Sequence, residues 1–198
     1  MFAALLILNI ACVFPPEDFE IITDEWCASS RYEVVDCVYD GDTFYLGGCA
    51  GESEEDFRML GIQAPELASG DQEAECYGPE AADLLEELLL GERVRMEFDV
   101  ECEGIYGRTL VWVFLEDPSP TIINTIEQID GFSESDSSDD YEDSSSTSSI
   151  LINEVLIRAG YATLYKSDVA NNIRYSERLE TAEDEAEEQS RGLWGACD

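Results

Sequence analysis

The stretch Asp56–Glu66 reads DFRMLGIQAPE, and it places one arginine, Arg58, inside a run that is otherwise typical of a buried strand. Burying a guanidinium is costly unless an anion meets it. The run ends in Pro65-Glu66, which predicts a turn that carries a carboxylate. The stretch therefore predicts a strand that holds an arginine ready for an anion.

Further strands are predicted on both sides of this stretch. Residues 32–46 indicate two strands around Asp40-Gly41, a strong hairpin signal. Residues 93–99 alternate between polar and apolar, and residues 108–115 are nearly all apolar. With the strand 56–62, the chain is expected to form five short strands.

Three helices are predicted. The first spans 77–93, with Pro79 near its start, leucines at helical spacing, and Gly91 at its end. The others span 152–162, closed by Gly160, and 172–191. A helix after the third of five strands is typical of an α+β fold, a five-stranded OB-type Greek-key barrel with three helices.

The N-terminal residues and the cysteines suggest export. Residues 1–11 are apolar but too short to span a bilayer, which predicts a signal-peptide-like leader, and residues 12–30 a tether. Ala11-Cys12 is similar to a bacterial lipoprotein cleavage site, so a lipid anchor at Cys12 and an ordinary signal peptide are alternatives. Seven cysteines without His or CxxC favour disulfides over zinc. The expected location is secreted or the outer surface of a bacterium.

The net charge is −36, from 10 basic and 46 acidic residues. By itself it opposes nucleic-acid binding, which depends on basic side chains. An acidic surface suits high salt, where self-repulsion is screened, or divalent-cation binding, and composition does not choose between them.

Residues 133–149 are almost entirely Ser, Asp and Glu, which predicts a disordered insertion in a domain spanning 31–195. It is a solvated spacer or, alternatively, a calcium-binding or self-masking loop.

Charged residues at three places suggest phosphate chemistry. DGDT carries Asp40 and Asp42 around a turn, and Arg58 and Arg108 head apolar strands in a chain with few basic residues. Paired guanidiniums suit a phosphate because each offers a planar fork to two oxygens. A nearby carboxylate can hold a hard cation or activate water.

Six segments in order resemble the staphylococcal nuclease (thermonuclease) family: DGDT, FRMLGIQAPE, CYGPEA, IYGRTL, INEVLIRAGYA and SRGLW. The resemblance covers about 32–194 apart from the insertion and implies the OB-type fold. It also implies a calcium site, with Asp42 as a ligand and Ala64 offering its carbonyl. Gln63 departs from the family, which has an aspartate there, so this ligand would bind without charge.

The resemblance assigns catalysis to Arg58 and Arg108, which would bind the scissile phosphate, and to Glu66 as general base. Tyr106 would bind substrate by stacking or hydrogen bonding; the alternative is a buried strand residue. The implied function is a monomeric, secreted, calcium-dependent nuclease that cuts single-stranded DNA or RNA with little sequence preference and leaves 3′-phosphates.

The alternative function is an inactive nucleic-acid or phosphate-binding module on the same barrel, suggested by Gln63 and the negative charge. A Cys76–Cys102 disulfide is expected because both segments border the site in the family fold. Other pairings stay open.

Overall fold

The computed structural model describes residues 29–49, 55–99, 101–130, 149–166 and 173–197. The predicted leader 1–11, nearly all of the tether 12–30 and most of the insertion 133–149 lie outside these residues, as does Cys12. The statements made about them above remain predictions. Within the described part of the chain, no helix has the length and hydropathy that a membrane crossing requires.

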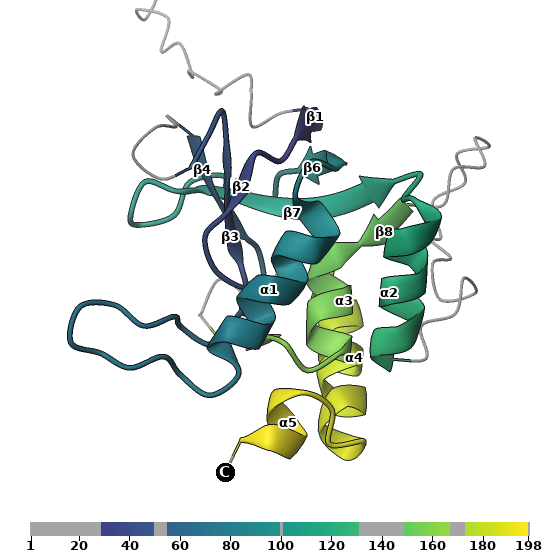
Figure 1. The fold of residues 1–198 in the computed structure, drawn as a ribbon. Helices are drawn as coiled ribbons and strands as arrows, with labels where there is room; N and C mark the ends of the chain where they lie inside the picture. The colour runs from purple at the N-terminus through teal and green to yellow at the C-terminus, as the bar shows by residue number, and fades with distance from the viewer. Residues whose placement is uncertain (1–28, 50–54, 100, 131–148, 167–172, 198) are drawn as a thin grey trace, which may run out of the picture.

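One mixed sheet forms the centre of the fold (Figure 1). Its strand order is β1 (Arg31–Val34), β6 (Arg93–Glu97), β7 (Thr109–Glu116), β4 (Glu55–Met59), β3 (Thr43–Leu46) and β2 (Cys37–Val38), with β8 (Ser149–Leu151) also on β7. Neighbours pair antiparallel except β4 and β7, which are parallel. A separate pair consists of β5 (Ile62–Gln63) and β9 (Thr163–Leu164).

The predicted α+β class is confirmed, but the count of five strands is too low. The first predicted strand is two strands, because the chain changes partner at Val35 and Asp36. The backbone N–H of Val35 donates to Glu92, whereas that of Asp36 donates to Tyr45. The first and last strands of the sheet path, β1 and β2, therefore belong to one continuous stretch of chain. The remaining extra strands have only two or three residues, too few to show a period.

The count of three helices is also too low. The predicted helices correspond to α1 (Gly78–Leu89), α3 (Ile152–Arg158) and α4 (Ser176–Glu188). The structure adds α2 (Pro120–Asp130) and the short α5 (Leu193–Ala196). The signal for α2 was present, because Ser119-Pro120 precedes isoleucines at helical spacing and the Ser119 hydroxyl accepts the N–H of Ile122 at 3.3 Å.

Alternation along β3 and β4 separates the core from the face that carries the charged side chains. Phe44 and Phe57 are opposite each other in the register, fully buried, and stacked with ring centroids 5.4 Å apart. Because successive side chains point to opposite faces, Thr43, Tyr45 and Arg58 lie on the other side of these strands.

A buried amide joins α3 to the sheet. Asn153 is fully buried; its Nδ2 donates to the carbonyl of Leu60 at 2.9 Å, and its Oδ1 accepts the N–H of Val113 at 3.0 Å. Both backbone groups depend on this side chain, so Asn153 fixes the position of α3 against β7.

Two disulfides are described, Cys37–Cys49 and Cys76–Cys197. The expected Cys76–Cys102 pair is wrong, and Cys102 is itself disulfide-bonded. The partner of Cys76 is Cys197, which is 121 residues away in sequence; α5 brings it to the start of α1. No local pattern at either cysteine indicates this approach.

Replacing Asn153 with leucine should lower the free energy of unfolding by about 2–4 kcal/mol, because two buried backbone groups lose their partner. Urea denaturation measures this change. The matched control is Asn124→Leu at an exposed position on α2, where we expect about 0.5 kcal/mol or less. Equal losses at the two positions would contradict the role of Asn153.

Replacing both Cys76 and Cys197 with serine should destabilise the fold more than replacing both Cys37 and Cys49. The first disulfide closes a far longer loop, with a separation of 121 residues against 12. The chain-entropy relation gives about 5 and about 3 kcal/mol for these two loops. Non-reducing urea denaturation tests the order, and a larger loss for the Cys37–Cys49 pair would contradict it.

Candidate functional site

The hairpin between β2 and β3 positions Asp42. The N–H of Tyr39 donates to the carbonyl of Thr43 at 2.9 Å, and the N–H of Asp42 donates to Oδ1 of Asp40 at 3.1 Å. A Cβ on Gly41 would lie 2.6 Å from the Cβ of Ala64, so only glycine lets the turn approach so closely. The turn thus presents the Asp42 carboxylate to the segment that follows β5.

Arg58 meets its anion inside the protein. The residue is 9% exposed, and its Nη2 lies 2.9 Å from Oδ2 of Asp42. Nη2 also donates to Oε1 of Gln63 at 2.9 Å, and Nη1 donates to the carbonyl of Met59 at 3.1 Å. The guanidinium is therefore held in place by one carboxylate and two neutral oxygens.

The Asp42 carboxylate has several partners. Besides Arg58, Oδ2 accepts the N–H of Ala64 at 2.7 Å, and Oδ1 accepts the hydroxyl of Thr43 at 3.1 Å. Burial raises the pKa of Asp42 to about 7; Arg58 opposes this rise and the neighbouring Asp40 adds to it. Desolvation thus outweighs the attraction of the guanidinium.

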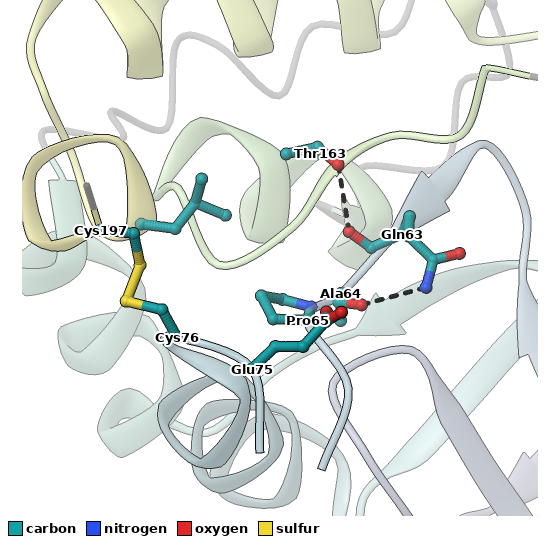
Figure 2. A pocket seen from close by; sticks show the side chains of 8 residues that line it. Gln63, Ala64, Pro65, Glu75, Cys76, Thr163 and Cys197 are labelled. Carbon is teal, nitrogen blue, oxygen red and sulfur yellow. Dashed lines mark hydrogen bonds between the residues drawn. A yellow bond between two sulfur atoms is a disulfide. The ribbon is translucent and has the colours of Figure 1, made fainter. Parts of the chain in front are cut away.

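Gln63 joins Arg58 to Glu66. Its Oε1 accepts from Arg58, while its Nε2 donates to the carbonyl of Ala64 at 3.1 Å and to Oε1 of Glu66 at 3.2 Å. Figure 2 shows the hydrogen bond from the Gln63 side-chain amide to the Ala64 carbonyl, and the one from the Thr163 hydroxyl to the main-chain carbonyl of Gln63. An amide can serve both sides because it carries an acceptor and a donor; an ionised aspartate could not donate to Glu66.

The backbone of Glu66 is fixed although its side chain is exposed. Its N–H donates to the Glu75 carboxylate at 3.0 Å, and its carbonyl accepts the N–H of Glu75 at 2.9 Å. A Cβ on Gly78 would lie 2.5 Å from the Glu66 carbonyl oxygen. The loop from Glu66 to Cys76 extends away from the rest of the molecule (Figure 1), yet its base is closed at Glu66.

Arg108 and Tyr106 lie on the other side of Thr43. Arg108, partly buried just before β7, donates from Nη1 to the Thr43 hydroxyl at 3.4 Å. Its guanidinium carbon lies 5.9 Å from the centroid of the Tyr106 ring. Tyr106 is 79% exposed, so the alternative of a buried strand residue is wrong.

The structure thus brings most of the predicted residues together. Asp42, Arg58, Gln63, Ala64 and Glu66 form one connected hydrogen-bonded set, and Arg108 joins it through Thr43. Tyr106 lies at the edge. Sequence reasoning considered Asp40 with Asp42 as turn residues or metal ligands and kept only Asp42 in the site, but Asp40 is a buried carboxylate that shapes the turn and raises the pKa of Asp42.

The oxygens of this set suit a hard cation in kind, since they are a carboxylate, a backbone carbonyl and an amide oxygen. Their charge is low, because residue 63 contributes none. No group of three or more His, Cys, Asp or Glu side chains placed to hold a metal occurs among the described residues. The residues therefore fit a weakly held cation better than a tightly held one.

A pocket of about 310 Å³ lies on the far side of Gln63 and Ala64, against the C-terminal segment. Its lining includes Pro65, Glu75 and the Cys76–Cys197 disulfide (Figure 2). Neither Arg58 nor Arg108 lines this pocket. The connected set around Arg58, rather than this pocket, is therefore the candidate site.

Two curated proteins that are similar in sequence to this chain are thermonucleases. A thermonuclease of Staphylococcus hyicus is 25% identical over 194 residues, which cover 97% of this chain and 92% of that protein. A thermonuclease of Staphylococcus intermedius is 35% identical over 80 residues, 40% of this chain and 46% of that protein. These relatives support a function of the nuclease type. The family described as "Staphylococcal nuclease homologue" matches residues 56–196, and the chain belongs to this staphylococcal nuclease family.

Proposed function

We propose that this chain is a nuclease that hydrolyses the phosphodiester bonds of single-stranded DNA and RNA, with little sequence preference, and leaves 3′-phosphates. The observation that carries the proposal is that Arg58 contacts Asp42 and Arg108 contacts the adjacent Thr43, whose hydroxyl donates to Asp42, while Gln63 links Arg58 to Glu66. Two guanidiniums can stabilise the negative charge that builds on a phosphate during hydrolysis, and a carboxylate can orient or deprotonate the water.

In the proposed mechanism, the two arginines bind nonbridging oxygens of the scissile phosphate. Arg58 is held by Asp42 and Gln63, so its guanidinium does not have to reorganise as negative charge builds on phosphorus. Glu66, whose exposed carboxylate reaches solvent, orients or deprotonates the attacking water. As the water oxygen bonds to phosphorus, the P–O5′ bond breaks, and the 5′ oxygen leaves with a proton taken from solvent. Gln63 holds that carboxylate on the side of Arg58.

We propose a calcium ion as the cofactor, held by Asp42, the Ala64 carbonyl and the amide oxygen of Gln63. A bound divalent cation supplies positive charge that offsets the charge of the phosphate. The oxygen donors support this assignment, whereas the neutral amide at residue 63 predicts weaker affinity than an aspartate would give.

We further infer that the mixed sheet is a closed five-stranded barrel of the OB type. The sheet path starts on β1 and ends on β2, which are separated by only Val35 and Asp36. If β1 and β2 are counted as one strand and the peripheral β8 is left out, five strands surround a common core. The family match supports the same architecture.

The proposed location is outside the cell, as a secreted or lipid-anchored monomer. The Cys37–Cys49 and Cys76–Cys197 disulfides support it, because such bonds persist in oxidising compartments. The acidic surface is proposed as an adaptation to high salt, so activity should rise with ionic strength.

Replacing Arg108 with alanine, or Arg58 with lysine, should each reduce cleavage of denatured DNA in calcium at least about 100-fold, because one planar fork to the phosphate is lost. The lysine substitution keeps a charge beside Asp42 and so protects the fold. The measurement is the initial rate of release of acid-soluble nucleotides. The matched control is Arg93→Ala, at an exposed position at the start of β6, which should cleave normally.

A wild-type protein that cleaves no nucleic acid at any salt or calcium concentration would contradict the nuclease. If that protein still binds oligonucleotides, the alternative function, an inactive nucleic-acid-binding module, is supported instead. Gln63 and the net charge of −36 are the observations that favour this alternative.

Replacing Gln63 with aspartate should lower the calcium concentration needed for half-maximal activity, because a charged ligand replaces a neutral one. Calcium should also raise the melting temperature of this variant more than that of the wild type. Gln128→Asp, at an exposed position on α2, adds the same charge far from the site and is the control. Unchanged calcium dependence would show that Gln63 is not a ligand.

A further inference from the structure

Two tyrosines share the face of the sheet that carries Arg58. The pairing of β2, β3 and β4 sets Tyr39 opposite Thr43, and Thr43 opposite Arg58. One row further along, Tyr45 is opposite Asp56. Cross-strand partners and residues two apart lie on one face, so both rings belong to the face of the candidate site and not to the core.

The two rings form an aromatic surface that is open to solvent. Tyr39 is 52% exposed and Tyr45 is partly exposed. Their ring centroids are 6.1 Å apart and their planes are nearly perpendicular, at 89°. An edge-to-face pair of this kind presents the face of one ring beside the edge of the other.

Arg108 lies next to this surface. It contacts the hydroxyl of Thr43, which is two residues from Tyr45 on the same face of β3. Burial raises the pKa of Tyr45, Asp56 raises it further, and the positive charge of Arg108 opposes the rise, as a neighbouring cation must. The exposed ring of Tyr106 lies beyond Arg108. Arg108 therefore has one aromatic ring, Tyr106, against it, and lies close enough to Tyr45 for its charge to influence that ring.

The negative charges near the two rings favour an uncharged base over a phosphate as the group that binds there. Asp40 and Asp56 are close enough to influence Tyr45, and both would repel a phosphate placed on the rings. A nucleobase carries no charge and has a flat face that stacks on any aromatic side chain. In a protein with a net charge of −36, stacking can supply affinity that electrostatic attraction cannot.

We propose that Tyr39 and Tyr45 form a base-stacking subsite, which holds an unpaired nucleobase adjacent to the phosphate bound by Arg58 and Arg108. The proposal rests on the nuclease function proposed above and adds the residues that grip the substrate strand. Because both faces of a base inside a duplex are covered by its stacked neighbours, the subsite makes the enzyme select unpaired strands, whose bases can turn out of the stack.

The test is the binding of a short fluorescein-labelled oligothymidylate in chelator, followed by fluorescence anisotropy. Tyr45→Ala and Tyr39→Ala should each raise Kd about tenfold. Tyr45→Phe and Tyr39→Phe keep the ring and should bind within about twofold of the wild type. An abasic strand of equal length should bind wild type and alanine variants equally weakly.

The control is Tyr32→Ala, a tyrosine of similar exposure on β1 whose register partner is Arg95 on β6 and which contacts neither β3 nor β4 in the pairing; it should leave Kd unchanged. Since Tyr39 is half exposed, its alanine variant should keep the wild-type melting temperature and so separates binding from folding. The slope of log Kd against log salt should not change, because no ionic contact is lost.

Unchanged Kd in both alanine variants would overturn the subsite, and so would equal losses in the alanine and phenylalanine variants. Either result leaves the nuclease proposal intact if the wild type still cleaves denatured DNA. Absence of cleavage, with tyrosine-dependent binding retained, would overturn the nuclease and keep the subsite as part of a binding module.

Discussion

The buried ion pair between Arg58 and Asp42 is the constraint on which the rest of the site depends. Removing either partner would leave an uncompensated charge below the surface, a cost of about 3–5 kcal/mol. The hairpin must therefore hold Asp42 against β4, and Gly41 must lack a side chain so that the turn can pack on Ala64. The same pair fixes the guanidinium that faces the proposed phosphate.

The site combines few positive charges with many negative ones. Arg58 and Arg108 are its cations, and Asp40, Asp42 and Glu66 lie close to them. The neutral amide of Gln63 connects these opposing groups by hydrogen bonds and adds no further negative charge. In a chain of net charge −36, a neutral side chain at this position also reduces the repulsion that an incoming phosphate must overcome.

The sequence predicted the local elements well and the long-range ones poorly. The Asp40-Gly41 hairpin, the strand around Arg58 and the helix begun by Pro79 all have local signals, and the structure contains them. The change of strand partner at Val35 and the approach of Cys197 to Cys76 depend on segments far apart in the chain, so no local pattern could reveal them. The ordered motifs indicated which side chains form the site, but not that Gln63 connects them.

The disulfide between Cys76 and Cys197 makes the larger part of the chain a single covalent ring. A protease that cuts once anywhere inside this ring, including the serine- and acid-rich segment 133–149, leaves two pieces that remain joined. The ring carries Arg108, α1 and α3, whereas Arg58 and Glu66 precede it. A nicked molecule can thus keep both halves of the site together.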